Sequence, residues 1–242
     1  MVRGWTAWHT EPTTPREIRS VVELLSDRGS PAPPAVTGTF IGTPAELHPV
    51  LDRMVAAIGL PETQRTLVPT GYVQAASEAE RWGGGTWGAR VAFAAKSHIV
   101  RTPIIPSAAQ DLADAVDRMP ECRGAGGLLI EALGGAVSDV APTTTAFPHR
   151  TAIGVAQYHS YWDQTTEPDH VDQRLTWLRE VHATMQPHLG TGGYTNGMDP
   201  ELADWLIAYH GDNHPRLQRI KVTADPDDFF RFPQSIPPAH NA

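Results

Sequence analysis

Two stretches near the start of the chain combine a helix-start signal with apolar residues at helical spacing. Residues 14–17 and 43–46 both read Thr-Pro-x-Glu: the threonine hydroxyl can cap the third amide, proline suits the first helical position, and glutamate reaches back to the cap. Apolar residues follow each signal three or four positions apart, and Gly59 can end the second run. The pattern therefore predicts helices over 14–25 and 43–58.

The rest of the chain alternates between strand and helix patterns. β-branched and aromatic runs bounded by turn residues predict strands, and apolar stripes with a period near 3.6 predict helices. The predicted strands cover residues 35–42, 72–75, 90–95, 127–133, 136–140 and 151–162. The predicted helices cover residues 107–119, 171–189 and 199–210, followed by a short helix that holds Leu217 and Ile220. This order predicts an α+β fold, an antiparallel sheet with helices packed on one face.

The composition narrows the class of protein. A chain of 242 residues that is 40% hydrophobic can form a buried core. It has 19 Lys and Arg against 27 Asp and Glu, a net charge of −8, and no basic run, which argues against binding to nucleic acid or to a membrane surface. The single cysteine, Cys122, excludes an intrachain disulfide. The sequence shows no signal-peptide pattern and no apolar stretch of membrane-spanning length, so we expect a cytoplasmic protein.

Three short motifs suggest chemistry, and each has a simpler interpretation. Residues 83–88 read G-x-G-x-x-G, but a strand follows instead of a helix, so we interpret them as a glycine loop without a phosphate. His210 and His214 are spaced to share a metal on one helix, yet Gly211 should end that helix between them. We therefore interpret them as surface histidines and expect no metal site. Cys122 lies in a polar loop and is interpreted as an incidental thiol.

Longer patterns in the second half of the chain are more specific. They are Gly134-Gly135, Thr145-Ala-Phe-Pro-His-Arg150, Gln157-Tyr158, Trp162, Tyr194-Thr-Asn196, Tyr209-His-Gly-Asp-Asn213-x-x-Arg216-Leu217, Lys221, Asp225-Pro-x-x-x-Phe230-Arg231 and Gln234-Ser-Ile-Pro-Pro238. Together they resemble the C-terminal half of the berberine-bridge-enzyme-like FAD-linked oxidases. The resemblance is weak from about residue 5 and strong from about residue 128 to 238.

The resemblance implies a division of the chain and a reaction. Residues 1–190 would form the substrate-binding domain, built on an antiparallel sheet, and residues 191–242 the C-terminal segment whose helices return to the FAD domain in the family. The reaction would be oxidation of a small organic substrate of the sugar, alkaloid or polyketide type, with O2 as acceptor. The family's N-terminal FAD-binding domain has no counterpart in this sequence. We therefore expect FAD to be bound only with a partner FAD-binding chain, or the chain to form a homo-oligomer.

The resemblance also implies site residues. Gln157 would face the substrate, Tyr194 and Asn196 would lie on a strand beside the flavin ring, and Asn213 would point its amide at the polar edge of the flavin. The family motif Y-x-N-Y reads Tyr194-Thr-Asn-Gly197 here, so the tyrosine that serves as base is replaced by glycine.

Each of these residues has a structural alternative. Gln157 could be a satisfied sheet residue, Asn213 could cap the following helix, and His149 with Arg150 could pin a loop. Tyr194 and Tyr158 are the candidates within the chain for a replacement base. A second function therefore stays open beside the first, a flavin-free binding or interaction protein that has kept the fold without the chemistry.

Overall fold

The structure, a computed structural model, describes residues 1–27, 30–75, 77, 92–120 and 125–239. Its strands form one antiparallel sheet in the order β2-β1-β5-β6-β4, with β3 also paired to β1. The strands are β1 Ile18–Asp27, β2 Ser30–Pro31, β3 Ala35–Phe40, β4 Ala92–Val100, β5 Ala125–Ala132 and β6 Gly154–Trp162. The helices are α1 Val2–His9, α2 Pro44–Ile58, α4 Pro106–Asp117, α5 Pro168–Leu189, α6 Trp205–His210 and α7 His214–Ala224, with 3-10 turns η1 Gly135–Asp139 and η2 Gly211–Asn213. The predicted α+β class is confirmed.

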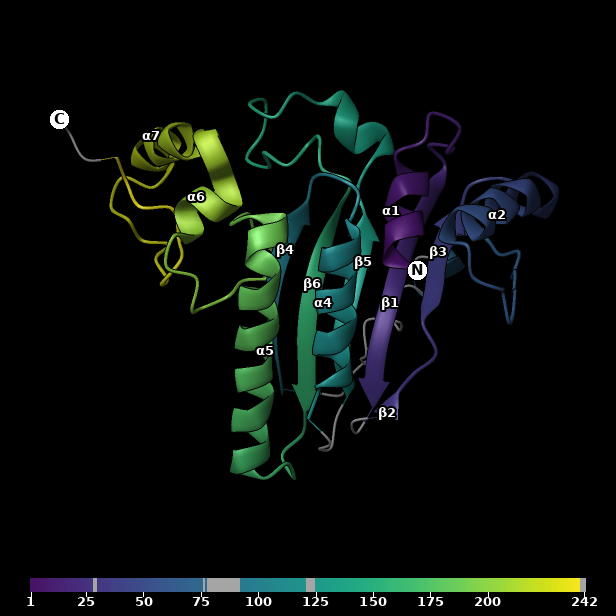
Figure 1. The fold of residues 1–242 in the computed structure, drawn as a ribbon. Coiled ribbons are helices and arrows are strands. Elements are labelled where there is room, and N and C mark those ends of the chain that lie inside the picture. Colours follow the sequence, from purple (N-terminus) through teal and green to yellow (C-terminus); the bar gives the residue numbers. More distant parts are fainter. Residues whose placement is uncertain (28–29, 76, 78–91, 121–124, 240–242) are drawn as a thin grey trace.

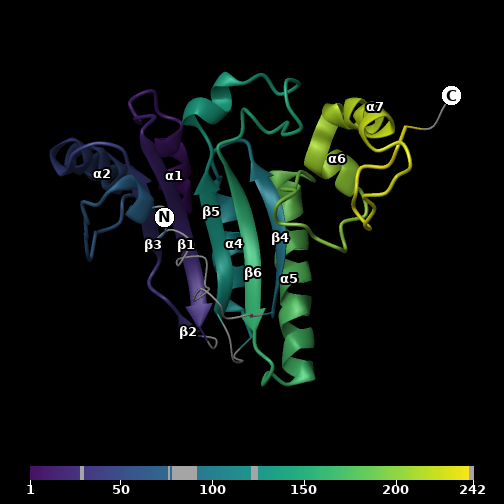
Figure 2. The same ribbon diagram turned by 180° about the vertical axis from the view of Figure 1, so that it is seen from behind.

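The helices α1, α4 and α5 cover one face of the sheet (Figure 1). The core lies between them and the strands, and every second strand residue points into it because side chains alternate across a strand. Fully buried members come from both layers: Trp5, Trp8, Leu112, Leu178 and Met185 from the helices, and Val22, Leu128, Ile130 and Tyr158 from the strands. Seen from behind, the opposite face of the sheet carries none of these helices (Figure 2).

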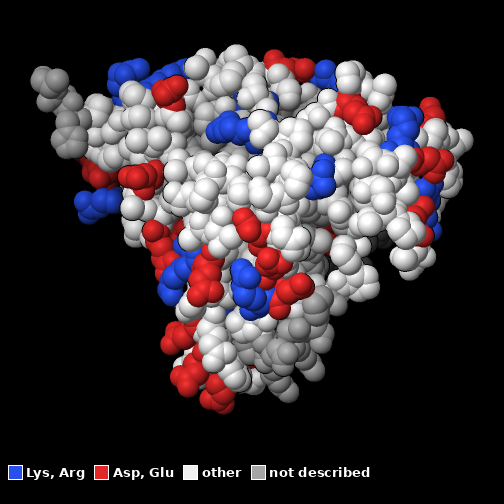
Figure 3. All heavy atoms as spheres, in the orientation of Figure 1, with Lys and Arg blue, Asp and Glu red and all other residues white. Residues whose placement is uncertain are grey.

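The outer surface of the helix layer has the character of a solvated face. Acidic and basic side chains are intermixed over α5 (Figure 3). Among the described residues, no helix is long and apolar enough to cross a membrane.

The two Thr-Pro-x-Glu segments have different structures. At Thr43 the predicted capping box is present, with the Glu46 amide donating to the threonine hydroxyl at 3.3 Å and the glutamate accepting from the Thr43 amide at 2.7 Å. The predicted helix over 14–25 is wrong, because β1 occupies this stretch. The Thr14 hydroxyl donates to the Trp8 carbonyl at 2.6 Å instead of capping a helix. As β1 pairs with β3 and β5 on either side, its β-branched residues gain more from the sheet than from an isolated helix.

Four further predictions need correction. Residues 72–75 are helical, and residues 136–140 fall in and just after the 3-10 turn η1, because Gly134 and Gly135 take positive φ and turn the chain. Strand β4 runs past Lys96 to Val100, and the helix expected from 199 begins only at Trp205. The sequence analysis also missed α1, whose two tryptophans lie in the core. The other predicted elements are confirmed within a few residues, and the proposed division at 190/191 remains a prediction.

The segment after α5 lies along the free edge of the sheet. The Ile99 amide donates to the Gly192 carbonyl at 3.2 Å, and the Tyr194 amide donates to the Ser97 hydroxyl at 3.0 Å. Both contacts attach to β4, the edge strand that has β6 on its other side. The C-terminal segment, which carries Tyr194, Asn196 and Gly197, is therefore held against the strands that carry Gln157.

Candidate functional site

Gln157 lies on the sheet face opposite the helices. Its neighbours in β6, Ala156 and Tyr158, point into the core between sheet and helices, so strand alternation directs Gln157 the other way. Its cross-strand partners are Ser97 on β4 and Leu129 on β5. The glutamine is half-buried, which leaves its amide accessible from this face.

Gly197 lies next to the side chain of Gln157. A Cβ atom placed on Gly197 would lie 3.0 Å from the Gln157 amide nitrogen, and its φ is not in the left-handed region. The glycine amide closes a turn by donating to the Tyr194 carbonyl at 3.0 Å. A side chain at position 197 would therefore project onto Gln157, where only the end of a flexible side chain stands in its way.

Tyr194 and Asn196 are joined to each other. The Asn196 amide donates to the Tyr194 hydroxyl at 2.9 Å, and the tyrosine ring lies edge-on to Phe147 with centroids 6.0 Å apart. Neither residue is on a strand, contrary to expectation: Tyr194 is in irregular backbone and Asn196 is in the turn. A turn therefore joins positions 194 and 197.

Asn213 holds a loop. It is buried at the end of η2, and its amide donates to the carbonyls of Pro142 at 2.7 Å and Thr145 at 3.0 Å. Its side chain does not cap α7, so the expectation of a helix cap is wrong. Since both amide hydrogens bind protein carbonyls, only the side-chain oxygen of Asn213 could contact a ligand.

His149 and Arg150 also fix this loop. The His149 Nδ1 atom accepts from Arg101 at 3.0 Å, so its Nε2 atom carries the hydrogen and donates to the Gly193 carbonyl at 3.1 Å. Burial, helped by the charge of Arg101, lowers the pKa of His149 to about 4. Arg150 donates to the Phe147 carbonyl at 3.2 Å and to the Thr145 hydroxyl at 2.6 Å. Both residues pin loops, as expected: His149 binds the backbone next to Tyr194, and Arg150 binds within the loop before it.

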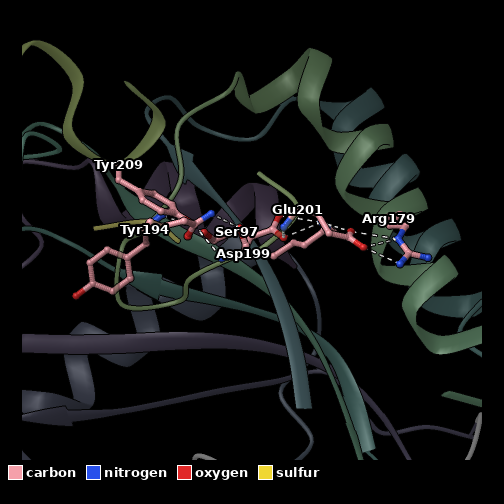
Figure 4. A network of polar contacts seen from close by, with 8 residues as sticks. Ser97, Arg179, Tyr194, Asp199, Glu201 and Tyr209 are labelled. Atoms are coloured by element: carbon pink, nitrogen blue, oxygen red, sulfur yellow. Dashed lines mark hydrogen bonds and ion pairs between the residues drawn. The ribbon is translucent and has the colours of Figure 1, made fainter. Parts of the chain in front are cut away.

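A chain of charged residues locks the C-terminal segment to the edge of the sheet (Figure 4). Lys96 is buried and binds Asp199 at 2.8 Å and Glu201 at 2.9 Å, and Glu201 binds Arg179 on α5 at 2.6 Å. Hydrogen bonds from Arg179 and Lys96 lower the pKa of Glu201 to about 2. The Asp199 amide donates to the Tyr209 hydroxyl at 2.9 Å. This lock was not predicted from the sequence, although a lysine in the middle of a mostly apolar strand was a signal for it.

Tyr158, one of the two tyrosines proposed as a replacement base, is not suited to that role. Tyr158 is fully buried on the helix side, its hydroxyl lies 3.1 Å from His98 Nδ1, and burial raises its pKa far above the ordinary value. The hydroxyl of Tyr194 accepts from the Asn196 amide at 2.9 Å and keeps its own hydrogen, so Tyr194 stays a candidate. The Tyr158 prediction is therefore wrong on burial and direction.

The short motifs add little to the site. The His214 Nδ1 atom lies 2.7 Å from the Gly211 carbonyl, and His210 shares a hydrogen bond with the backbone of Ala146. Within the described ranges, no group of three or more His, Cys, Asp or Glu side chains could hold a metal ion. The glycine motif at 83–88 and Cys122 lie outside the described residues.

The chain is similar to known proteins in sequence and in fold. The family model "Berberine and berberine like" matches residues 193–237. The uncharacterized FAD-linked oxidoreductase YgaK of Bacillus subtilis is 30% identical over 201 residues, which is 83% of this chain and 42% of that protein. Reticuline oxidase of Eschscholzia californica is 28% identical over 172 residues, covering 62% of this chain and 31% of that protein.

Solved structures share the fold over nearly the whole chain. BBE-like 1 of Physcomitrella patens superposes with a TM-score of 0.81 at 21% identity, covering 98% of this chain and 50% of that one. Aclacinomycin oxidoreductase gives a TM-score of 0.77 at 23% identity, covering 99% of this chain and 53% of that one. The chain spans about half the length of these structures and less than half of the curated relatives above. The chain therefore belongs to the berberine-bridge-enzyme-like family of FAD-linked oxidoreductases.

Proposed function

We propose that the chain forms the substrate-facing part of an FAD-linked oxidoreductase that oxidises a small organic molecule of the sugar, alkaloid or polyketide type, with O2 as electron acceptor. FAD would be held together with a further FAD-binding domain or partner chain. The observation that carries the proposal is the approach of position 197 to Gln157, 3.0 Å from a Cβ at that position to the amide nitrogen. Two segments 40 positions apart in sequence meet on the sheet face that the helices leave free.

The described residues fit a flat ring with polar edges. Tyr194 offers an aromatic ring, Gln157 an amide and Asn213 an amide oxygen, while the Asn196 amide reaches the Tyr194 hydroxyl from two residues away. Flavin, when bound, accepts a hydride from the substrate. The part of this chain would be to orient the substrate with Gln157 and to hold the 193–197 segment in place through His149 and the Lys96–Asp199 pair.

One observation favours the second function, a flavin-free binding protein. Position 197 has no side chain, and Tyr158, one of the two candidate replacement bases, is fully buried on the helix side. A protein that has given up oxidation would tolerate this loss, because ligand binding at Gln157 needs no base.

Reconstitution separates the two functions. The chain is co-expressed with the part of the Bacillus relative that it does not cover, and the purified material is examined for flavin absorbance and for flavin reduction by hydroxylated sugars and phenols. We expect a yellow complex in which Gln157→Ala slows flavin reduction about tenfold, the effect of losing one hydrogen bond to the reacting molecule. Gln110→Ala, an exposed glutamine on α4, is the matched control and should change nothing.

Two results would contradict the proposal. A stable complex without flavin would favour the binding protein. Flavin reduction that Gln157→Ala leaves unchanged would place the reacting substrate away from this face.

A further inference from the structure

Two contacts with the edge strand β4 hold the C-terminal segment on either side of the 194–197 turn. Before the turn, the Ile99 amide donates to the Gly192 carbonyl at 3.2 Å, which is a backbone contact at the edge of the sheet. After the turn, Asp199 binds Lys96 at 2.8 Å, and this lysine points to the helix side of the strand. Neither contact brings the segment onto the free face of the sheet.

Ser97 lies between these two contacts and points to the free face. It is buried, it is the cross-strand partner of Gln157, and its hydroxyl accepts from the Tyr194 amide at 3.0 Å (Figure 4). In a regular strand pair the amide of an added chain binds a backbone carbonyl, which keeps that chain in the plane of the sheet. Here the acceptor is a side chain above that plane, so the Tyr194 amide is drawn onto the free face. The Tyr194 side chain also packs on this face, against Ile99 and Val155.

The contact with Ser97 is the polar tie between the turn and the strands. Within the described ranges, residues 194–198 make no other hydrogen bond to the sheet. The side-chain amide of Asn196 and the backbone amide of Gly197 both bond back to the start of the turn. These internal bonds fix the shape of the turn but not its place on the sheet, so its approach to Gln157 depends on Ser97.

We propose that Ser97 is a positioning residue for the reaction at Gln157. Its hydroxyl holds the 194–197 turn over that glutamine, and without the hydroxyl the turn moves off the sheet face while its two ends stay at the edge. Alanine in place of Ser97 removes the acceptor and leaves the Tyr194 amide without its partner. The inference rests on the proposed function for the role of Gln157, but not for the position of the turn.

Nuclear magnetic resonance of the full chain without flavin measures where the turn lies. A Cβ on Gly197 would be 3.0 Å from the Gln157 amide nitrogen, so an α-proton of Gly197 should give a nuclear Overhauser effect to the side-chain amide protons of Gln157. We expect this effect in the wild type and in Ser107→Ala, the control at an exposed serine of α4. We expect Ser97→Ala to lose it and Ser97→Thr, which keeps a hydroxyl, to retain it.

Amide hydrogen exchange measures the hydrogen bond itself. The Tyr194 amide should exchange about tenfold faster in Ser97→Ala, the effect of losing one hydrogen bond. The Ile99 amide, which binds the Gly192 carbonyl, should keep its wild-type rate and so serves as the internal control. If Ser97→Ala fails to fold, Ser97→Cys takes its place, because a thiol of similar size is a weak acceptor.

Three results would overturn the inference. One is a wild-type spectrum without the Overhauser effect between Gly197 and Gln157. Another is an effect that persists in Ser97→Ala or, if that variant does not fold, in Ser97→Cys. The third is equal loss of protection at Tyr194 and Ile99, which would show that Ser97 supports the whole edge and not the turn.

The reconstituted complex gives a readout on the reaction. Ser97→Ala should slow flavin reduction about tenfold, because Tyr194 and Asn196 move with the turn, and Ser97→Thr should restore the rate. Failure of this inference and failure of the proposed function are distinguishable. A turn that leaves Gln157 in Ser97→Ala, in a chain that never forms a flavin complex, would support the inference and contradict the oxidoreductase. An active flavin complex whose turn and rate are indifferent to Ser97→Ala would do the reverse.

Discussion

The two faces of the sheet are built from alternating residues of the same strands, yet they serve different purposes. The helix-covered face is mostly apolar, and its buried Arg174 donates a hydrogen bond to the Ser160 hydroxyl. The free face carries Gln157 and His159, and His159 has a buried nitrogen without a partner. Trp8 and His98 on the helix-covered face also have buried nitrogens without a hydrogen-bond partner among the described residues, so the comparison rests on the helices that cover one face and on the approach of Gly197 to Gln157 at the other.

The largest expected effect is a loss of stability from a substitution in the core under the helix-covered face. Trp5 of α1 is fully buried and donates to the Ser20 hydroxyl at 3.1 Å. Trp5→Ala should lower the free energy of unfolding by about 3–5 kcal/mol, the cost of a large cavity in a packed core. Leu129→Ala on the free face is the comparison and should cost about 1 kcal/mol, because that leucine is only half-buried. Urea unfolding measures both, and equal losses would show that the free face is as much a core as the other.

A smaller effect concerns the lock between the sheet and the C-terminal segment. Lys96→Met leaves Asp199 buried without its cation and should destabilise the protein by about 3 kcal/mol. Arg179→Met removes an exposed partner of Glu201 and should cost less than about 1 kcal/mol. Amide hydrogen exchange should show faster exchange at Gly193 and Gly197 in the lysine variant only. If exchange there is unchanged, the lock does not position the segment.

A third effect, spread over the acid range, is a pH dependence that comes mainly from the helix-covered face. His98 stacks on His182 with centroids 4.1 Å apart, and burial, followed by the neighbouring His182, lowers its pKa to about 3. Between the unfolded value near 6.5 and this value, the unfolded chain binds more protons than the folded one. Stability is therefore complete above pH 6.5 and falls on acidification, by up to about 1.4 kcal/mol per pH unit for this residue.

The control for the pH dependence is a ring that cannot be protonated. His98→Phe should flatten the loss of stability measured by urea unfolding between pH 6.5 and 4, while His48→Phe should not. Residual dependence is expected from His149 and His159, whose pKa values are also lowered, each to about 4. An identical slope in His98→Phe and the wild type would contradict the assignment.

Local sequence signals predicted the elements whose contacts are local. The capping box at Thr43 and the long α5 stripe need only neighbouring residues, and both are present. The helix signal at Thr14 failed because strand pairing on both sides of β1 is decided by residues far away in sequence. The helix α1 was missed for the same reason: Trp5 and Trp8 are buried only because the chain later places a sheet against them.

The sequence indicated which residues belong to the candidate site, but it did not indicate which contacts they make. The family resemblance named Gln157 and drew attention to Gly197, and the structure brings these two together. The resemblance could not show that both amide hydrogens of Asn213 bind the carbonyls of Pro142 and Thr145, since these residues lie about 70 positions earlier in the chain.

The rate of flavin reduction in a reconstituted complex tests the central claim most directly, that substrate and flavin meet where position 197 faces Gln157. Gly197→Tyr would place a phenol beside Gln157 without backbone strain, whereas Gly71→Tyr, at a position with nothing within 4 Å of a Cβ, is the matched control. In a single turnover we predict that Gly197→Tyr raises the rate by at least ~10², the lower end for a placed general base, and that Gly71→Tyr leaves it unchanged. No gain from Gly197→Tyr, in a complex shown to hold both flavin and substrate, would contradict the claim.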